Sequence, residues 1–158
     1  MRITKYSVML DKDTMLNKLV KESSTNYSMC SNFNSPELIV NMLNDIYKLS
    51  EKAEEFVYML AFNTKQKLLG VFEVSHGTVK ASLLNPREIF IRALLCGASN
   101  IVIAHNHPSG DTTPSKEDIY ITKRMIDASK LIGLSLLDSI VIGGSTYTSL
   151  KEHNSNIF

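Results

Sequence analysis

The chain has 158 residues, of which 44% are hydrophobic and 21% are charged, a size and composition that suit one domain with a hydrophobic core. The net charge of +1 excludes the broad positive field of a protein that binds nucleic acid or an anionic membrane over a large surface. Cys30 and Cys96 stand in unrelated contexts, so neither a disulfide framework nor a cysteine-based zinc site is indicated. The absence of long apolar runs argues against a signal peptide or membrane span, and a cytoplasmic protein is expected.

The first third of the chain divides near residue 34. Residues 1–33 mix polar and apolar residues and lead into the polar stretch KESSTNYSMCSNFNS, which indicates a linker or an arm that packs on a neighbour. We predict that residues 34–158 form the folded domain. Its first helix is expected to begin with Ser35 as N-cap and Pro36 in the first turn, and to run to about Leu49.

The middle and end of the chain alternate between strand and helix signals. EEFVYMLAFNTKQKLLGVFEV predicts two strands around a polar turn, and a third strand is expected in GTVKASLL. A helix is predicted after Asn85 and Pro86, and NIVIAH follows as a strand buried on both faces. A further helix from about Lys116 to Ile132 and a strand in LSLLDSIVIGG complete the pattern. This alternation predicts an α/β domain with a mixed sheet covered by helices.

The stretch HNHPSGDTTPSKED, residues 105–118, carries the chemistry. If the preceding strand stays extended, His105 and His107 project from the same side, roughly 6.5 Å apart along the chain. Asp118 follows in the first turn of the next helix. Two histidines and one carboxylate leave a tetrahedral Zn²⁺ with an open position, the arrangement of a catalytic site. Water in that position becomes a nucleophile near neutral pH.

Other interpretations apply to parts of this stretch. Ser115 and Asp118 match the S-x-x-[DE] signature of a helix cap, and Ser115 can serve both the cap and a catalytic site. A lone histidine is more often a hydrogen-bonded structural residue than a ligand, which is our interpretation of His76 and His153. The consecutive letters HNH do not match the dispersed residues of the nucleases of that name. Zinc deaminases are excluded because neither their H-x-E nor their C-x-x-C pattern is present.

HNHP followed by PSKED resembles the metal motif of the JAB/MPN (JAMM) metalloprotease superfamily. The closer resemblance is to the RadC family, historically named for DNA repair, and it covers roughly residues 35 to 150. The resemblance implies a three-layer α/β/α domain akin to cytidine deaminases. It also implies that His105, His107 and Asp118 bind Zn²⁺, that Ser115 stabilises the oxyanion, and that Glu73 is the carboxylate that activates the attacking water.

The chain departs from the family pattern in two places. Larger RadC proteins carry an N-terminal helix-hairpin-helix-like region, and such hairpins need glycines, yet the first glycine here is Gly70. We therefore expect that DNA-binding module to be absent. Ser139 stands where many relatives have histidine after LLD, which puts any role of that histidine in doubt for this chain.

The expected function is zinc-dependent hydrolysis of a peptide or isopeptide amide, with a peptide or protein as substrate and partner. A first alternative is a protein of DNA repair or recombination that acts on or near nucleic acid. The near-neutral charge predicts only weak contact with nucleic acid, and no membrane contact is expected. A second alternative is a binding module that keeps zinc for stability and recognises a partner by strand addition. Structural zinc needs neither Glu73 nor Ser115, which disfavours that alternative.

Overall fold

The computed structural model of the chain describes residues 1–77, 84–153 and 156–158. Its elements follow in the order β1 (Arg2–Leu10), β2 (Asn17–Asn26), α1 (Pro36–Tyr47), the 3-10 helix η1 (Leu49–Glu51), β3 (Glu55–Phe62), β4 (Leu68–Gly77), α2 (Pro86–Leu95), β5 (Asn100–Asn106), α3 (Lys116–Leu131), β6 (Ser135–Gly143), β7 (Thr146–Ser149) and α4 (Leu150–His153). Within the described residues, no helix is long and apolar enough to cross a membrane.

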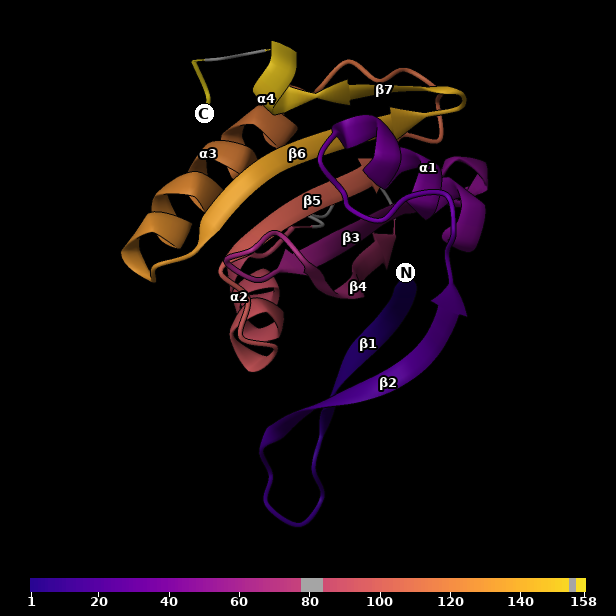
Figure 1. Ribbon diagram of the computed structural model, residues 1–158. Coiled ribbons are helices and arrows are strands. Elements are labelled where there is room, and N and C mark those ends of the chain that lie inside the picture. Colours follow the sequence, from indigo (N-terminus) through magenta and orange to yellow (C-terminus); the bar gives the residue numbers. More distant parts are fainter. Residues whose placement is uncertain (78–83, 154–155) are drawn as a thin grey trace.

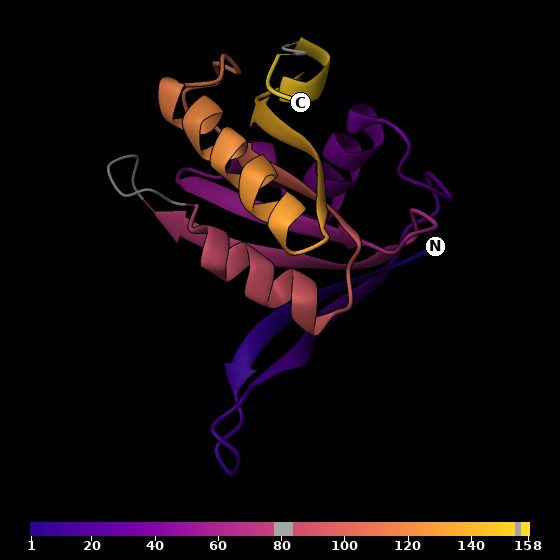
Figure 2. The same cartoon turned by 90° about the vertical axis from the view of Figure 1, so that its left-hand side faces the viewer.

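All described strands join one mixed sheet in the order β2-β1-β4-β3-β5-β6-β7. The pairs β1/β4 and β5/β6 are parallel, and the others are antiparallel. Helix α1 lies on one face of the sheet, and α2 and α3 lie on the other (Figures 1 and 2). The three-layer α/β/α architecture expected from the sequence is therefore confirmed.

Two hydrophobic clusters fill the spaces between the layers. The cluster beneath α2 and α3 includes Val57, Met59 and Ile103, whereas the cluster beneath α1 includes Tyr58 and Val102. Adjacent strand residues thus face opposite clusters, as the pleat of a strand requires. Which cluster a residue faces decides whether its side chain can reach a site on that side of the sheet.

The helix boundaries follow the local signals in the sequence. The hydroxyl of Ser35 accepts a hydrogen bond from the backbone of α1, and the side-chain amide oxygen of Asn85 does the same for α2, each with proline in the first turn. Helix α3 ends within a residue of the prediction, before Gly133 at φ +73°. The third strand expected in residues 77–84 falls almost entirely on residues 78–83, outside the described residues.

The N-terminal region contains two strands that the interpretation as a linker or arm did not include. Strands β1 and β2 form an antiparallel hairpin that projects from the body of the domain (Figures 1 and 2). Lys5 of β1 pairs with Val71 of β4, which joins the hairpin to the sheet. The Lys5 ammonium group also binds Glu73 of β4 at 2.8 Å and Glu22 of β2 at 3.1 Å. One side chain therefore ties both hairpin strands to the domain.

Candidate metal centre

Three side chains converge at the carboxyl end of β5. His105, His107 and Asp118 each offer a ligand atom, and these atoms lie within 4.8 Å of one another. His105 Nε2 is 3.2 Å from His107 Nε2 and 3.3 Å from Asp118 Oδ1, and His107 Nε2 is 3.6 Å from Asp118 Oδ2. The structure thus brings together all three residues that the sequence proposed as ligands.

The sheet determines where the first histidine points. His105 pairs with Val57 of β3 and Val141 of β6, which both belong to the cluster beneath α2 and α3. Asp118 reaches the histidines from the first turn of α3 on the same side. The buried strand and the start of the helix therefore fix two of the three groups from different elements.

A loop fixes the second histidine. The backbone N–H of His107 donates to Ile142 O at 2.8 Å, and its ring Nδ1 lies 2.7 Å from Asp111 O. A carbonyl oxygen can only accept, so Nδ1 carries the proton, and in the neutral ring Nε2 presents its lone pair to the cluster. The loop packs tightly on β6, since a Cβ at Gly143 would overlap the carbonyl oxygen of Gly110.

Ser115 begins α3 as a capping box. Its backbone N–H and its hydroxyl donate to Asp118 Oδ2 at 2.7 and 2.6 Å, and its hydroxyl oxygen accepts from the Asp118 N–H at 3.1 Å. The capping interpretation is confirmed. These bonds also hold the Asp118 carboxylate toward the histidines, so Ser115 positions a proposed ligand. Its expected contact with an oxyanion stays a prediction.

The Asp118 carboxylate is held in its ionised form, which is the form that binds a cation. Burial opposes ionisation of Asp118, but hydrogen bonds with His105 and His107 outweigh it and hold the pKa of Asp118 far below its usual value. The pKa of His107 is raised by its hydrogen bond with Asp118, with smaller contributions from the Asp111 carbonyl and the charge of Glu55. Two imidazoles and an ionised carboxylate are ligands that zinc commonly takes in proteins, so the donor set fits that metal.

Glu73 lies away from His105, His107 and Asp118, on the other face of the sheet. It pairs with Tyr58 of β3, whose side chain lies in the cluster beneath α1, on the opposite face of the sheet. Its carboxylate accepts from Lys5 Nζ at 2.8 Å and from the Tyr58 hydroxyl at 3.2 Å, and lies 3.3 Å from His76 Nδ1. Glu73 therefore belongs to the ion-pair network that ties the hairpin to the sheet.

A different carboxylate stands on the correct face. Glu55, the first residue of β3, is two residues before Val57, which pairs with His105. Glu55 has the same parity as Val57 in β3 and so points to the same face of the sheet as His105, and the charge of this half-buried residue contributes to the raised pKa of His107. Among the described residues, the metal-ligand group contains only His105, His107 and Asp118, so Glu55 lies outside it. Glu55 was not among the candidate residues indicated by the sequence.

Asn106, between the two histidines, holds the strand that carries Glu55. Its side chain is buried, with the amide oxygen accepting from Phe56 N–H at 2.8 Å. Its amide nitrogen donates to Glu54 O at 2.9 Å and to Lys52 O at 3.3 Å. Backbone groups on both sides of Glu55 are therefore bound by one residue of the histidine motif.

Comparison with known proteins agrees with this geometry. A family model described as "RadC-like JAB domain" matches residues 33–155. The chain belongs to the RadC family. Relatives named "UPF0758 protein" include one from Alkaliphilus metalliredigens, 42% identical over 118 residues, which are 75% of this chain and 50% of that protein. A RadC-family relative from Carboxydothermus hydrogenoformans is 45% identical over 120 residues, 76% of this chain and 52% of its own length. The chain thus spans about half the length of the curated relatives it matches.

Proposed function

We propose that this RadC-family chain is a zinc-dependent hydrolase of peptide or isopeptide amides. The observation that carries the proposal is the convergence of His105, His107 and Asp118 at the surface end of a buried strand. These three residues would hold the metal. When bound, Zn²⁺ supplies positive charge that polarises a substrate carbonyl and makes water a nucleophile near neutral pH.

We assign the role of general base to Glu55 instead of Glu73. Glu55 shares a sheet face with the two histidines, stands outside the ligand group, and is half-buried at the start of β3. A carboxylate so placed can take the proton from the attacking water and deliver it to the leaving amine nitrogen. Asn106 fixes the backbone around it, so the carboxylate needs little reorganisation to act.

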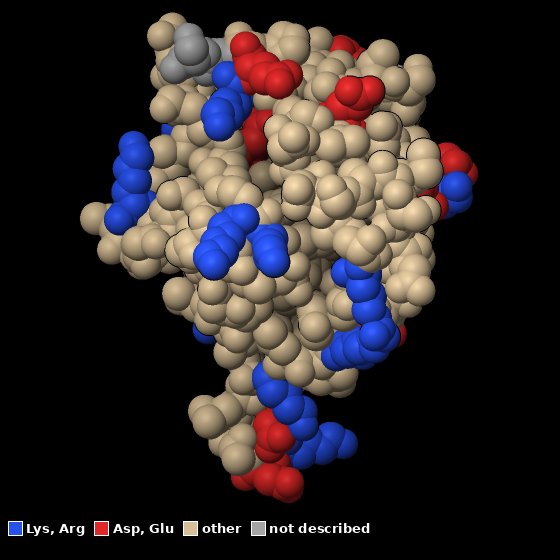
Figure 3. All heavy atoms as spheres, viewed as in Figure 1, with Lys and Arg blue, Asp and Glu red and all other residues tan. Residues whose placement is uncertain are grey.

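The remaining groups have supporting roles in this proposal. Ser115 holds the Asp118 carboxylate, and its exposed hydroxyl is the candidate that could turn to the developing oxyanion. The Asp111 carbonyl keeps the proton of His107 on Nδ1, away from the proposed metal. Lys and Arg side chains lie in small groups separated by uncharged surface on the face shown in Figure 3, which gives no support to the nucleic-acid alternative on that face.

The test compares Glu55→Gln with Glu73→Gln on zinc-loaded protein and a fluorogenic peptide library. Glu55→Gln should keep zinc and the fold, measured by elemental analysis and thermal unfolding, while hydrolysis falls roughly 10²- to 10⁴-fold. Glu73→Gln should keep most of the activity, because Glu73 lies on the other face. The reverse pattern would return the base to Glu73. Zinc-loaded wild-type protein that cleaves nothing in the library would contradict the peptidase proposal itself.

A further inference from the structure

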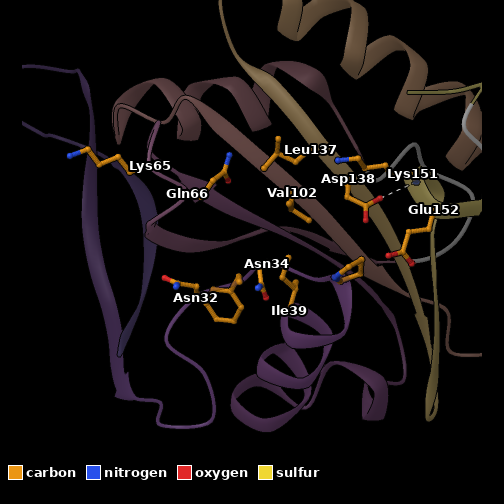
Figure 4. A pocket seen from close by; sticks show the side chains of 12 residues that line it. Asn32, Asn34, Ile39, Lys65, Gln66, Val102, Leu137, Asp138, Lys151 and Glu152 are labelled. Carbon is orange, nitrogen blue, oxygen red and sulfur yellow. Dashed lines mark hydrogen bonds between the residues drawn. The ribbon is translucent and has the colours of Figure 1, made fainter.

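A cavity of about 740 Å³ lies on the face of the sheet opposite the candidate metal centre (Figure 4). Its floor is apolar and includes Phe33, Ile39 and Val102, which all belong to the cluster beneath α1. Val102 precedes His105 by three residues in β5, so the cavity is separated from the histidines by about 10 Å of strand as well as by the sheet. Its volume is within the range of cavities that hold small ligands.

An irregularity in β6 directs two side chains into this cavity. The register with β5 shifts between Ile101, which pairs with Leu136, and Val102, which pairs with Asp138, so Leu137 is an extra residue. Leu136 packs beneath α2 and α3, while Leu137 and Asp138 both line the cavity. Such bulges re-aim side chains and are common beside binding sites.

Asp138 supplies a buried carboxylate at one end of the cavity. It is 6% exposed and accepts hydrogen bonds from the Ser149 hydroxyl at 2.6 Å, the Ser139 N–H at 2.8 Å and the Lys151 N–H at 3.2 Å. Every donor is neutral, and no cationic side chain among the described residues forms an ion pair with it. Burial raises the pKa of Asp138, and the charge of Glu152 adds to this effect.

The charges at this end sum to a negative value. Glu152 lines the cavity beside Asp138, and Lys151 lines it as the single cation there. Lys151 and Glu152 are exposed to solvent, so the buried Asp138 carboxylate is the charge at this end that lacks an ionic partner among the described residues. A ligand that brings a positive group to this end would supply that partner.

The other end of the cavity carries one basic side chain on a fixed turn. Lys65 and Gln66 lie across the cavity from Asp138 and Glu152, on the turn between β3 and β4 (Figure 4). The side chain of Asn63 accepts from Lys65 N–H at 2.9 Å, and its carbonyl accepts from Gln66 N–H at 3.0 Å. These bonds fix the backbone of the turn. The Lys65 side chain is exposed and its ammonium group points away from the cavity in Figure 4, so it would turn inward to meet a ligand.

Three amide side chains on the cavity wall are free to bind a ligand. Asn32, Asn34 and Gln66 make no side-chain hydrogen bond within the described part of the chain. Each offers a donor and an acceptor together, which is the complement of a peptide group. A negative end, a basic end, an apolar floor and amide side chains are the features that a short peptide with free termini would satisfy.

We propose that this cavity binds a short peptide of about two or three residues with apolar side chains, its ammonium group toward Asp138 and Glu152 and its carboxylate toward Lys65. The site is separate from the metal centre and does not depend on hydrolysis. The apolar side chains lie on the floor formed by Val102 and Leu137.

The dipeptide Leu-Leu is the probe, with N-acetyl-Leu-Leu and Leu-Leu amide as forms that lack one charge. Titration followed by backbone NMR should shift the amide signals of Val102 and Leu137, with Kd on the order of 1 mM or below. Removing either terminal charge should weaken binding about tenfold. Mass spectrometry checks that the dipeptide stays intact. Equal affinity for all three forms, shifts confined to the His107 loop, or no saturation by ~10 mM would each overturn the proposal.

Variants test the two ends separately. Asp138→Asn should weaken Leu-Leu about tenfold and leave the affinity for N-acetyl-Leu-Leu unchanged, since that form has no ammonium group. Because Asp138 is buried, Lys65→Met, at an exposed position, provides a second test: it should weaken Leu-Leu and spare Leu-Leu amide. Lys67→Met, on the same turn but outside the cavity wall, is the matched control. A Lys65→Met protein that binds Leu-Leu like the control would contradict the orientation and the proposal.

Discussion

Replacing Asn106 with Ala tests the structural connection between the histidine motif and β3. The substitution removes the partner of three backbone groups, the N–H of Phe56 and the carbonyls of Glu54 and Lys52. At roughly 1 kcal/mol for each hydrogen bond, the free energy of unfolding should fall by about 3 kcal/mol. Water can reach the start of β3 more easily than its middle and can replace part of the lost hydrogen bonding. The free energy of unfolding should therefore fall by at least about 2 kcal/mol.

Urea unfolding and native-state hydrogen exchange measure this prediction. The amide of Phe56 should exchange faster in Asn106→Ala than in the wild type, because its hydrogen bond is gone while the middle of β3 keeps its pairing. Asn100→Ala is the matched control, since the Asn100 side chain makes one bond, to Asn63 O at 3.1 Å, and should cost about 1 kcal/mol. If Asn106→Ala lost no more stability than the control, or left Phe56 exchange unchanged, the positioning role of Asn106 would be refuted.

Three further substitutions probe the site and the hairpin. His107→Ala removes one of three proposed ligands, so zinc measured by elemental analysis should fall well below about one per chain. Gly143→Ala places a methyl group against the Gly110 carbonyl, and we expect a loss of about 1–3 kcal/mol in urea unfolding with weaker zinc retention against a chelator. Burial acts to raise the pKa of Glu73, but the hydrogen bond and charge of Lys5 hold it below 4.5. A lowered pKa adds stability above about pH 4.5 that disappears as the pH falls through the folded value, so Lys5→Met should flatten the acid side of the stability profile.

Each of these substitutions has a control at an exposed position. Glu117→Ala removes a carboxylate from the first turn of α3 and should keep zinc, so equal zinc loss in both variants would argue against a specific ligand role for His107. Ser145→Ala adds no atom near the loop and should leave stability unchanged. Lys67→Met removes a positive charge away from Glu73. If its unfolding profile between about pH 3 and pH 7 changed as much as that of Lys5→Met, the ion pair would not be the cause.

The parts of the fold that could be predicted from sequence are those set by neighbouring residues. The caps at Ser35, Asn85 and Ser115 and the glycine after α3 act within a few residues, and the structure has each helix where these signals lie. Strands β1 and β2 have few buried residues, they form a hairpin with each other, and only β1 pairs with the rest of the described sheet, through a contact between Lys5 and Val71 that is distant in sequence. Composition alone could not show that pairing, because exposed polar strands and polar linkers have similar residues.

In the candidate site, too, the residues placed by local sequence could be predicted and the residue placed by strand pairing could not. His105 near the end of β5, His107 just beyond it in the loop, and Asp118 in a first helical turn lie within 14 residues of one another, so local sequence signals could place all three groups. Choosing between Glu55 and Glu73 required the face of the sheet, which depends on the register of three strands and on a shift in the β3–β4 pairing between Val57 and Tyr58. One signal was present in the sequence, because Glu55 and Val57 are two residues apart in one strand and therefore face the same side of the sheet. That side could be identified as the side of His105 only once the pairing of Val57 with His105 was known.

Strand β5 serves two sites with alternate residues. His105 faces the metal centre, while Val102 and Ala104 face the side of the proposed peptide cavity. Point mutations at one set of positions can therefore accumulate without altering side chains at the other set, and the two sites can diverge separately among homologous genes. A deletion of one codon within β5 would have the opposite effect, because every residue beyond it would change face and both sites would be lost in a single event.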